Sequence, residues 1–232
     1  MTSFGLLLKV ARAALCGGSN RAFYDRIAPF YDAVFIKHRV HADTIVDKLD
    51  DLYAGAEEST HLLDLGCGTG MLSKLLVNSG FNVIGLDVSF ESLRILAQQE
   101  ERLAILQAEA ERLPLPDGCL QGVVSLGVWR HLPDQKPILD EIVRVLGDEG
   151  VLIVGYFPPA IAGLYRARCD ALTRSLAWIY QAFTRMLGYA DRVDFALEQE
   201  VMTEMSKRFE FVERIHSGRR WNLLYARYPT MS

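Results

Sequence analysis

The feature that most constrains this chain is a short apolar run that leads straight into three glycines at alternate positions. Residues 62–65 are followed by Gly66, Gly68 and Gly70, and a stretch of helical composition begins at Met71. Glycine permits sharp backbone turns and lets a ligand approach the main chain closely. In open α/β sheets, ligands bind at the carboxyl ends of the strands. The segment therefore predicts a strand, a ligand-binding turn and a helix, in that order.

Short runs rich in valine, isoleucine and leucine recur along the middle of the chain, with helical stretches between them. The predicted strands are residues 61–65, 82–86, 103–107, 122–126 and 151–156, and the predicted helices are residues 71–78, 90–99 and 135–146. Runs without polar alternation are typical of parallel strands that helices cover on both faces. Alternating strands and helices predict a doubly wound α/β fold.

The two ends of the chain do not continue the alternation of strands and helices. A helix is predicted over residues 39–53, and residues 161–187 carry an apolar helical stripe that is too long for a simple connection. A helix over residues 198–208 and two strands, residues 209–216 and 220–228, predict an antiparallel edge hairpin. We therefore divide the chain into an N-terminal helical segment (1–55), a core (56–157 and 206–232) and a helical insertion (158–205).

The composition excludes several classes of protein. With 25 basic and 29 acidic residues, the net charge of -4 is too near neutral to favour a nucleic-acid partner. The cysteines are widely separated and lack zinc-ligand spacing, so we expect no metal and reduced thiols: Cys16, Cys67, Cys119 and Cys169. No apolar run approaches the ~20 residues of a spanning helix, and we read no export signal. We expect a cytoplasmic protein.

The glycine spacing discriminates between nucleotide ligands. The pattern D-x-G-x-G-x-G, from Asp64 to Gly70, differs from the dinucleotide fingerprint G-x-G-x-x-G, and no P-loop lysine follows. Asp87 ends the second predicted strand, 21 residues after Gly66, where a carboxylate can accept both hydroxyls of a ribose. The pattern favours a nucleoside ligand over the other interpretation, a turn with a purely structural role.

With these residues, the chain resembles the class I S-adenosylmethionine-dependent methyltransferases. Residues 107–117 resemble the family's acid-Ala-x-x-Leu-Pro-Phe segment, and residues 123–133 resemble its fourth strand with a His-Leu-x-Asp continuation. Residues 146–152 resemble the turn into its fifth strand, so the resemblance covers about residues 60–156. It implies a seven-stranded Rossmann-like sheet with an antiparallel last strand. It also implies a helical substrate cap, residues 158–205, inserted after strand five.

The resemblance implies roles for the first two strand ends. Gly66, Gly68 and Gly70 would pass close to the methionine portion of S-adenosyl-L-methionine. Asp64 would contact its ammonium directly or through water, and Asp87 would hold its ribose.

The resemblance also implies an adenine site. Glu109, at a position where the family more commonly has aspartate, and Ala110 would contact the adenine edge. Further cofactor contacts are implied for Cys67, Val88 and Leu126. The departure at Glu109 bears on the subfamily more than on the cofactor.

Residues 23–32 resemble the entry segment of quinone-biosynthesis methyltransferases and bacterial phospholipid N-methyltransferases, which folds over the cofactor. Tyr24 and Tyr31 are seven residues apart and would share a helical face. Their electron-rich rings would wall the sulfonium site. Aromatic packing with solvated hydroxyls is the other interpretation.

Methyl transfer from a sulfonium is an in-line displacement, in which the protein mainly positions the reactants and excludes water. A general base is needed only when the acceptor must lose a proton. His131, just after the fourth predicted strand, is the candidate base. It could equally cap the following helix or pair with the backbone.

The methyl acceptor is predicted from weaker signals. The stripe in residues 161–187 would line a lipophilic pocket or pack on the sheet edge. Residues 4–15, with Lys9 and Arg12 opposite an apolar face, would lie on a membrane surface or dock on the cap. We predict a small lipophilic acceptor, a quinone precursor first and a phospholipid amine second. A nicotinamide-dependent oxidoreductase, which the glycine spacing disfavours, and a non-catalytic nucleoside-binding protein are the rival hypotheses.

Overall fold

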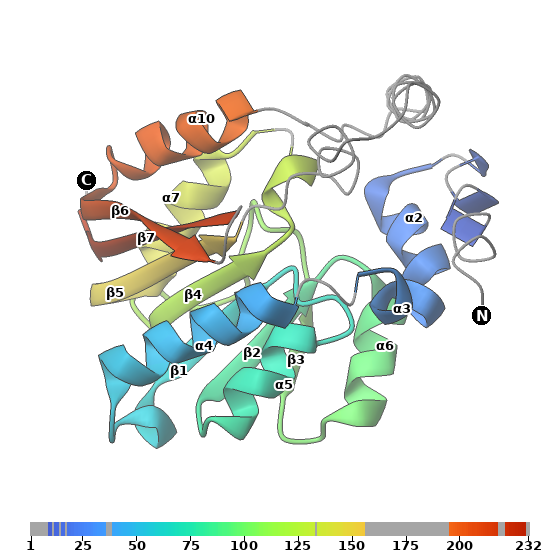
Figure 1. Cartoon of the computed structure of the whole chain (residues 1–232), viewed down its shortest axis with the longest axis horizontal. Helices are drawn as coiled ribbons and strands as arrows, with labels where there is room; N and C mark the ends of the chain where they lie inside the picture. The colour runs from blue at the N-terminus through green and yellow to red at the C-terminus, as the bar shows by residue number, and fades with distance from the viewer. Residues whose placement is uncertain are drawn as a thin grey trace.

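The computed structural model describes residues 9–10, 12–13, 15–16, 18–35, 39–132, 134–155, 195–217 and 221–230. These residues form one sheet between two layers of helices (Figure 1). The seven strands are β1 (His61–Leu65), β2 (Asn82–Asp87), β3 (Ala104–Gln107), β4 (Leu120–Leu126), β5 (Leu146–Gly155), β6 (Phe209–Ser217) and β7 (Trp221–Pro229). Their order across the sheet is β3-β2-β1-β4-β5-β7-β6.

The direction of the strands defines where a ligand can bind. Strands β1 to β5 are parallel, and β7 runs antiparallel to both β5 and β6. From β1 the chain builds outward through β2 and β3, and then returns to the other side of β1 with β4 and β5. The reversal leaves a crevice at the carboxyl ends of β1 and β4. The predicted doubly wound sheet with an antiparallel last strand is confirmed.

Alternate residues of the strands face opposite helical layers, as the pleat requires. Leu62 packs in a cluster with α4 (Arg39–Tyr53), α5 (Met71–Asn78) and α6 (Phe90–Gln99). Its neighbour Leu63 packs in a second cluster with α7 (Lys136–Val145) and α10 (Phe195–Met205). Because both faces are covered, the strands read as continuous apolar runs.

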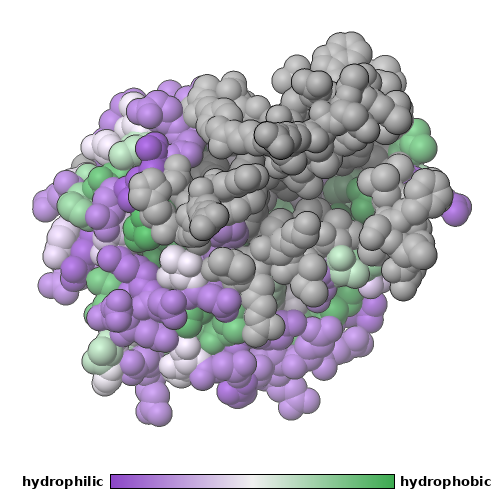
Figure 2. Space-filling view, in the orientation of Figure 1, coloured by the Kyte–Doolittle hydropathy of each residue, from purple (hydrophilic) through white to green (hydrophobic). Residues whose placement is uncertain are grey.

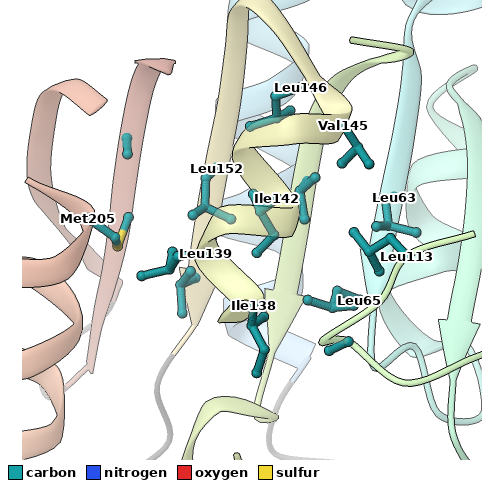
Figure 3. Close-up of a cluster of buried hydrophobic side chains, with 14 of the residues drawn as sticks. Leu63, Leu65, Leu113, Ile138, Leu139, Ile142, Val145, Leu146, Leu152 and Met205 are labelled. Atoms are coloured by element: carbon teal, nitrogen blue, oxygen red, sulfur yellow. The ribbon is translucent and has the colours of Figure 1, made fainter. Parts of the chain in front are cut away.

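Helix α7 shows how local sequence produces this packing. Pro137 lies in its first turn, where a missing amide donor costs no hydrogen bond. Its apolar side chains recur at helical spacing and are fully buried against the sheet (Figure 3): Ile138, Leu139, Ile142 and Val145. Burying each contributes about 1.5–3 kcal/mol.

The opposite layer has a polar outer surface. Asp43, Asp47 and Asp51 of α4 are exposed, whereas Ile45 and Leu49 are fully buried. Figure 2 shows mostly hydrophilic side chains along the lower margin of this face, where Figure 1 places α4 and α5. The buried side chains recur at helical spacing, so one face of α4 packs on the sheet and the other faces solvent.

The N-terminal helices lie beside α6 (Figure 1). They are α2 (Asn20–Ile27), the 3-10 turn η1 (Ala28–Phe30) and α3 (Tyr31–Phe35). The Ser19 hydroxyl caps α2 by accepting the Ala22 amide at 3.3 Å. Ile27 and Ala28 are buried, so the segment is anchored by apolar contacts.

Two predicted elements begin three or more residues away from their positions in the structure. Strand β5 begins at Leu146, which pairs with Leu120 before a register shift, and the ladder resumes at Val151. Helix α10 spans Phe195–Met205 instead of residues 198–208, and it packs against α7 and β6. The remaining predicted cap, residues 158–194, lies outside the described residues, so the proposed domain boundaries stay a prediction.

The helices and the N-terminal end are the two regions that bear on whether the chain contacts a membrane. Within the described ranges, no helix is both long enough and apolar enough to cross a membrane. Of residues 4–15, the structure describes 9, 10, 12, 13 and 15. Ala13 is buried and its carbonyl accepts from Arg26 Nη1 at 3.4 Å, whereas Leu15 is 59% exposed. Contact of this stretch with a membrane or with the cap stays a prediction.

Candidate active site

A cavity of about 390 Å³ lies at the carboxyl ends of β1, β2 and β4. Nine of the twelve predicted cofactor residues line it: Tyr24, Tyr31, Gly66, Gly68, Asp87, Val88, Glu109, Ala110 and Leu126. The candidate base, His131, lines it as well. Asp64, Cys67 and Gly70 do not belong to its lining.

The glycine loop, residues 66–70, contains glycine for two different physical reasons. A Cβ built on Gly66 would lie 2.1 Å from Val128 Cγ2, and one on Gly70 would lie 2.1 Å from Leu96 Cδ1. Gly68, by contrast, would meet only Tyr31 Cε1, at 4.0 Å. All three have positive φ. Packing therefore requires glycine at Gly66 and Gly70, whereas at Gly68 the missing side chain leaves room for a ligand.

Asp64 lies beneath the cavity and is 1% exposed. Its Oδ2 accepts a hydrogen bond from Ser73 Oγ of α5 at 2.5 Å. Burial is the main cause that raises the pKa of Asp64 to about 7; the hydrogen bond from Ser73 opposes this rise and the nearby charge of Asp87 contributes to it. Contact with the cofactor's ammonium stays a prediction, and it would favour the ionised form.

Cys67 is a core residue of the loop. It is 8% exposed, and burial raises the pKa of its thiol. A Cβ built on Gly85 would lie 3.1 Å from Cys67 Sγ, so the side chain packs against β2. The backbone amides of Gly66 and Cys67 both donate to the Leu86 carbonyl, at 2.7 and 3.0 Å. Cys67 thus holds the turn against β2.

Asp87, at the end of β2, is held by two backbone amides. Gly68 N donates to Oδ2 at 2.9 Å, and Ser89 N donates to Oδ1 at 2.8 Å. Burial raises the pKa of Asp87, and these hydrogen bonds oppose that effect. An ionised carboxylate has about four acceptor sites. Each oxygen therefore keeps capacity for one ribose hydroxyl.

The predicted adenine residues, Glu109 and Ala110, lie in the loop that follows β3. Ala110 is buried and Glu109 is exposed. The amide of Ala108 donates to the Asp87 carbonyl at 3.3 Å, which ties this loop to the end of β2. The ribose carboxylate and the predicted adenine residues are thus parts of one backbone arrangement.

His131 ends the 3-10 turn η4 (Trp129–His131) and contacts an aromatic side chain of α2. Tyr24 Oη and His131 Nε2 are 2.7 Å apart, within hydrogen-bond distance, and their rings meet edge to face. The Tyr24 and Tyr31 ring centroids are 6.2 Å apart. Asn20 Nδ2 donates to the His131 carbonyl at 3.1 Å. The contact of the imidazole with Tyr24 places a titratable pair inside the cavity.

Sequence reasoning missed part of the lining. The beginning of α2 contributes Ser19, Asn20 and Arg21. The strands and the segments that follow them add apolar surface from Leu65, Leu86, Ala108, Val128 and Leu132, and the lining also includes Ser92, Glu111 and Gly127. Ser19 before a helical stretch is a capping signal that could have located the beginning of α2. Nothing local indicates that this helix end reaches the cavity, because that contact joins elements over 100 residues apart.

A known protein family matches the part of the chain that runs from β1 to β5. A methyltransferase domain model matches residues 63–154. The ubiquinone/menaquinone biosynthesis C-methyltransferase of Syntrophotalea carbinolica is 33% identical over 65% of this chain and 68% of the relative. The 2-methyl-6-phytyl-1,4-hydroquinone methyltransferase of Synechocystis sp. is 30% identical over 65% of this chain. The chain spans 54% of that relative's length.

Solved structures agree on the fold. A SAM-dependent methyltransferase from Aquifex aeolicus has a TM-score of 0.56, over 79% of this chain and 89% of that chain, at 17% identity. The sequence relatives above define the class. The chain belongs to the class I S-adenosylmethionine-dependent methyltransferases, whose cofactor is S-adenosyl-L-methionine.

The residues of the cavity fit this cofactor. Gly68 offers a main-chain surface that a side chain would fill, and Asp87 retains acceptor capacity after binding two amides. Tyr24 and Tyr31 line the same cavity, where their rings would lie near the sulfonium of a bound cofactor. Among the described residues, no group of three or more potential ligands could hold a metal ion.

Proposed function

We propose that this chain transfers a methyl group from S-adenosyl-L-methionine to a ring carbon of a small lipophilic quinol. The observation that carries the proposal is the Tyr24–His131 contact at 2.7 Å within the cavity. A quinol carbon becomes strongly nucleophilic only as the ring hydroxyl loses its proton, so this reaction needs a base. The names of the relatives, which are quinone-related methyltransferases, support the same acceptor class.

The cofactor, when bound, supplies an electrophilic methyl group on a sulfonium. Asp87 would accept hydrogen bonds from the ribose, and Gly68 would let the methionine portion pass close to the main chain. Glu109 and Ala110 would contact the adenine. Tyr24 and Tyr31 would wall the reacting centre and exclude water from it.

We infer that the proton of the quinol hydroxyl leaves through Tyr24 and His131. With the Tyr24 hydroxyl donating to a neutral His131 Nε2, the phenol oxygen can accept the quinol hydroxyl hydrogen bond. As the carbon attacks, the quinol proton moves to Tyr24 and the Tyr24 proton moves to His131. The ring carbon would take the methyl group from the sulfonium, so that a C–CH₃ bond forms as the S–CH₃ bond breaks. The carbon would then release its hydrogen to solvent as a proton, and His131 would return its proton through Tyr24 to the ring oxygen, so that one proton is released overall.

The apolar lining supports a lipophilic acceptor. Leu126, Val128 and Leu132 line the cavity close to His131 in sequence. Hydrocarbon walls raise the strength of the polar contacts between Tyr24 and His131 because they lower the local dielectric. We infer that the polar ring edge of the acceptor meets this pair.

The test is a transfer assay with radiolabelled S-adenosyl-L-methionine and three acceptors: a short-chain demethylmenaquinol, phosphatidylethanolamine vesicles, and none. We expect label in the quinol alone, on carbon by product mass spectrometry. Titration with S-adenosylhomocysteine, beside reduced nicotinamide dinucleotide, reports cofactor binding independently of the acceptor. Label in phosphatidylethanolamine alone would replace the quinol with an amine, and binding without any transfer would contradict the catalytic role.

A further inference from the structure

The α2–α3 segment, residues 20–35, carries the dipeptide Tyr-Asp twice, seven residues apart. Tyr24 and Tyr31 line the cavity. The aspartates that follow them, Asp25 and Asp32, are bound instead to the two loops that leave β1 and β2. The same segment therefore supplies walls through its tyrosines and anchors through its aspartates.

Asp25 is bound at the beginning of α6. Its Oδ1 accepts both the Ser89 hydroxyl, at 2.7 Å, and the Glu91 amide, at 3.1 Å. Ser89 is the N-cap of α6, and its Oγ accepts the Ser92 amide at 3.2 Å. The first amides of a helix have no partner within the helix, and negative charge is favoured there. A carboxylate of α2 thus completes the cap of another helix.

Asp32 is bound to the glycine loop. Its Oδ1 accepts a hydrogen bond from Thr69 Oγ1. Thr69 is 2% exposed and lies between Gly68 and Gly70, so its side chain cannot be satisfied by solvent. Without Asp32, a buried hydroxyl would lose this acceptor.

The two anchors are connected through Asp87. Ser89, which donates to Asp25 through its hydroxyl, donates to Asp87 Oδ1 through its amide at 2.8 Å. Gly68 donates to Asp87 Oδ2 at 2.9 Å and is covalently joined to Thr69. The hydrogen bonds therefore form a closed circuit that runs from Asp25 through the carboxylate of Asp87 to Asp32 and returns along the backbone of residues 25–32.

We propose that Asp25 and Asp32 are positioning residues that couple the docking of the α2–α3 segment to cofactor binding. The inference rests on the proposed function in one respect, namely that Asp87 holds the ribose. A ligand that orders Asp87 and Gly68 stabilises both anchor points, so the segment docks more tightly. By linkage, a docked segment binds the cofactor more tightly by the same factor. The adjacent tyrosines are then placed only when the cofactor site is formed.

The anchors suggest an informative pair of substitutions. Both hydrogen bonds to Asp25 end on one oxygen, Oδ1, and an asparagine retains such an oxygen. Asp25→Asn should therefore keep most of the coupling, and Asp25→Ala should lose it. The same comparison applies to Asp32. Asp43→Asn, at an exposed position of α4 outside the cavity lining, is the matched control for loss of charge.

The experiment measures S-adenosylhomocysteine affinity by calorimetry and hydrogen exchange of residues 20–35 with and without that ligand. We expect Asp25→Ala and Asp32→Ala each to weaken binding about three- to thirtyfold, the range of a lost cap. We expect both to speed exchange of residues 20–35 even without ligand. Asp25→Asn and Asp32→Asn should recover most of the affinity, and Asp43→Asn should match the wild type. The ligand should slow exchange of this segment in the wild type.

Specific outcomes would overturn the proposal. Wild-type affinity in folded Asp25→Ala and Asp32→Ala proteins would overturn it and leave the proposed function intact. Weakened affinity without faster exchange of residues 20–35 would also overturn it, because the segment would not carry the effect. A folded wild type that does not bind S-adenosylhomocysteine would overturn both the coupling and the proposed function. Thermal unfolding of each variant separates these outcomes from misfolding.

Discussion

The glycine loop and the α2–α3 segment line one cavity by different means. The loop acts through its backbone: its amides bind the Leu86 carbonyl and the Asp87 carboxylate, and two of its glycines are required by packing. The α2–α3 segment acts through side chains, with Tyr24, Asp25 and Asp32 reaching three different loops. Backbone contacts depend on a local turn, whereas side-chain contacts depend on how distant elements pack. The first region should therefore govern stability and the second should govern closure and chemistry.

The largest effect should separate two glycines of the same loop. In Gly70→Ala, the new Cβ would overlap Leu96 Cδ1, and Leu96 is fully buried. Together with the positive φ, we expect a loss of about 2–4 kcal/mol in the free energy of unfolding, measured in urea. Gly68→Ala should cost about 1 kcal/mol of stability and yet abolish tight S-adenosylhomocysteine binding. Equal stability of the two variants would contradict the division between packing and ligand glycines.

The next effect concerns the aromatic pair. Tyr24→Phe keeps the ring but removes the hydroxyl that contacts His131 Nε2. We expect turnover of the quinol to fall about 100-fold, the scale of general-base catalysis, with S-adenosylhomocysteine affinity within about threefold of wild type. His131→Gln should lower turnover similarly and remove a step from the pH profile of kcat. Unchanged turnover and pH dependence in either variant would remove the pair from the mechanism.

Asp87 connects the glycine loop to the α2–α3 segment, so its substitution tests the predicted ribose site at that connection. Asp87→Ala removes the acceptor of the Gly68 and Ser89 amides and the predicted ribose ligand. We expect S-adenosylhomocysteine binding to weaken by about 1–3 kcal/mol in calorimetry. Wild-type affinity would show that the ribose binds elsewhere.

The smallest effect is a pH dependence of binding. Because burial raises the pKa of Asp64 to about 7, this carboxyl is mostly protonated at pH 6 and mostly ionised at pH 8. A cationic ammonium prefers the ionised form, so S-adenosylhomocysteine affinity should rise by up to about tenfold over this interval. Asp64→Asn should flatten the difference between pH 6 and pH 8. An identical rise in both proteins would show that Asp64 does not contact the ammonium.

Much of the cofactor side was predictable from the sequence. Its strands and the turns after them are local, and an acid or glycine at a strand end points to the same edge of the sheet in any doubly wound fold. Gly68, Asp87, Glu109 and Ala110 accordingly lie in the cavity where they were predicted. Asp64 and Cys67 are absent from its lining, because the pleat of β1 turns Asp64 toward Ser73 of α5, and the turn after β1 packs Cys67 in the apolar cluster of that same helical layer.

The acceptor side was predictable only in outline. The tyrosines and His131 were recognised as candidates, but nothing local indicates that Tyr24 contacts a histidine 107 residues away. The aspartates at positions 25 and 32 carried no signal of their own, since exposed-looking acids in a helical segment are ordinarily solvated.

The sequence by itself determined the alternation of strands and helices, the glycine turn and the class of cofactor, because each depends on short-range backbone geometry and apolar periodicity. Only the tertiary structure decided which glycines are required by packing, which carboxylates are buried, and how Asp25 and Asp32 join the loops after β2 and β1. The physical reason is that these properties arise from contacts between elements far apart in the chain. A local pattern specifies each element, but the packing of one element on another specifies the site.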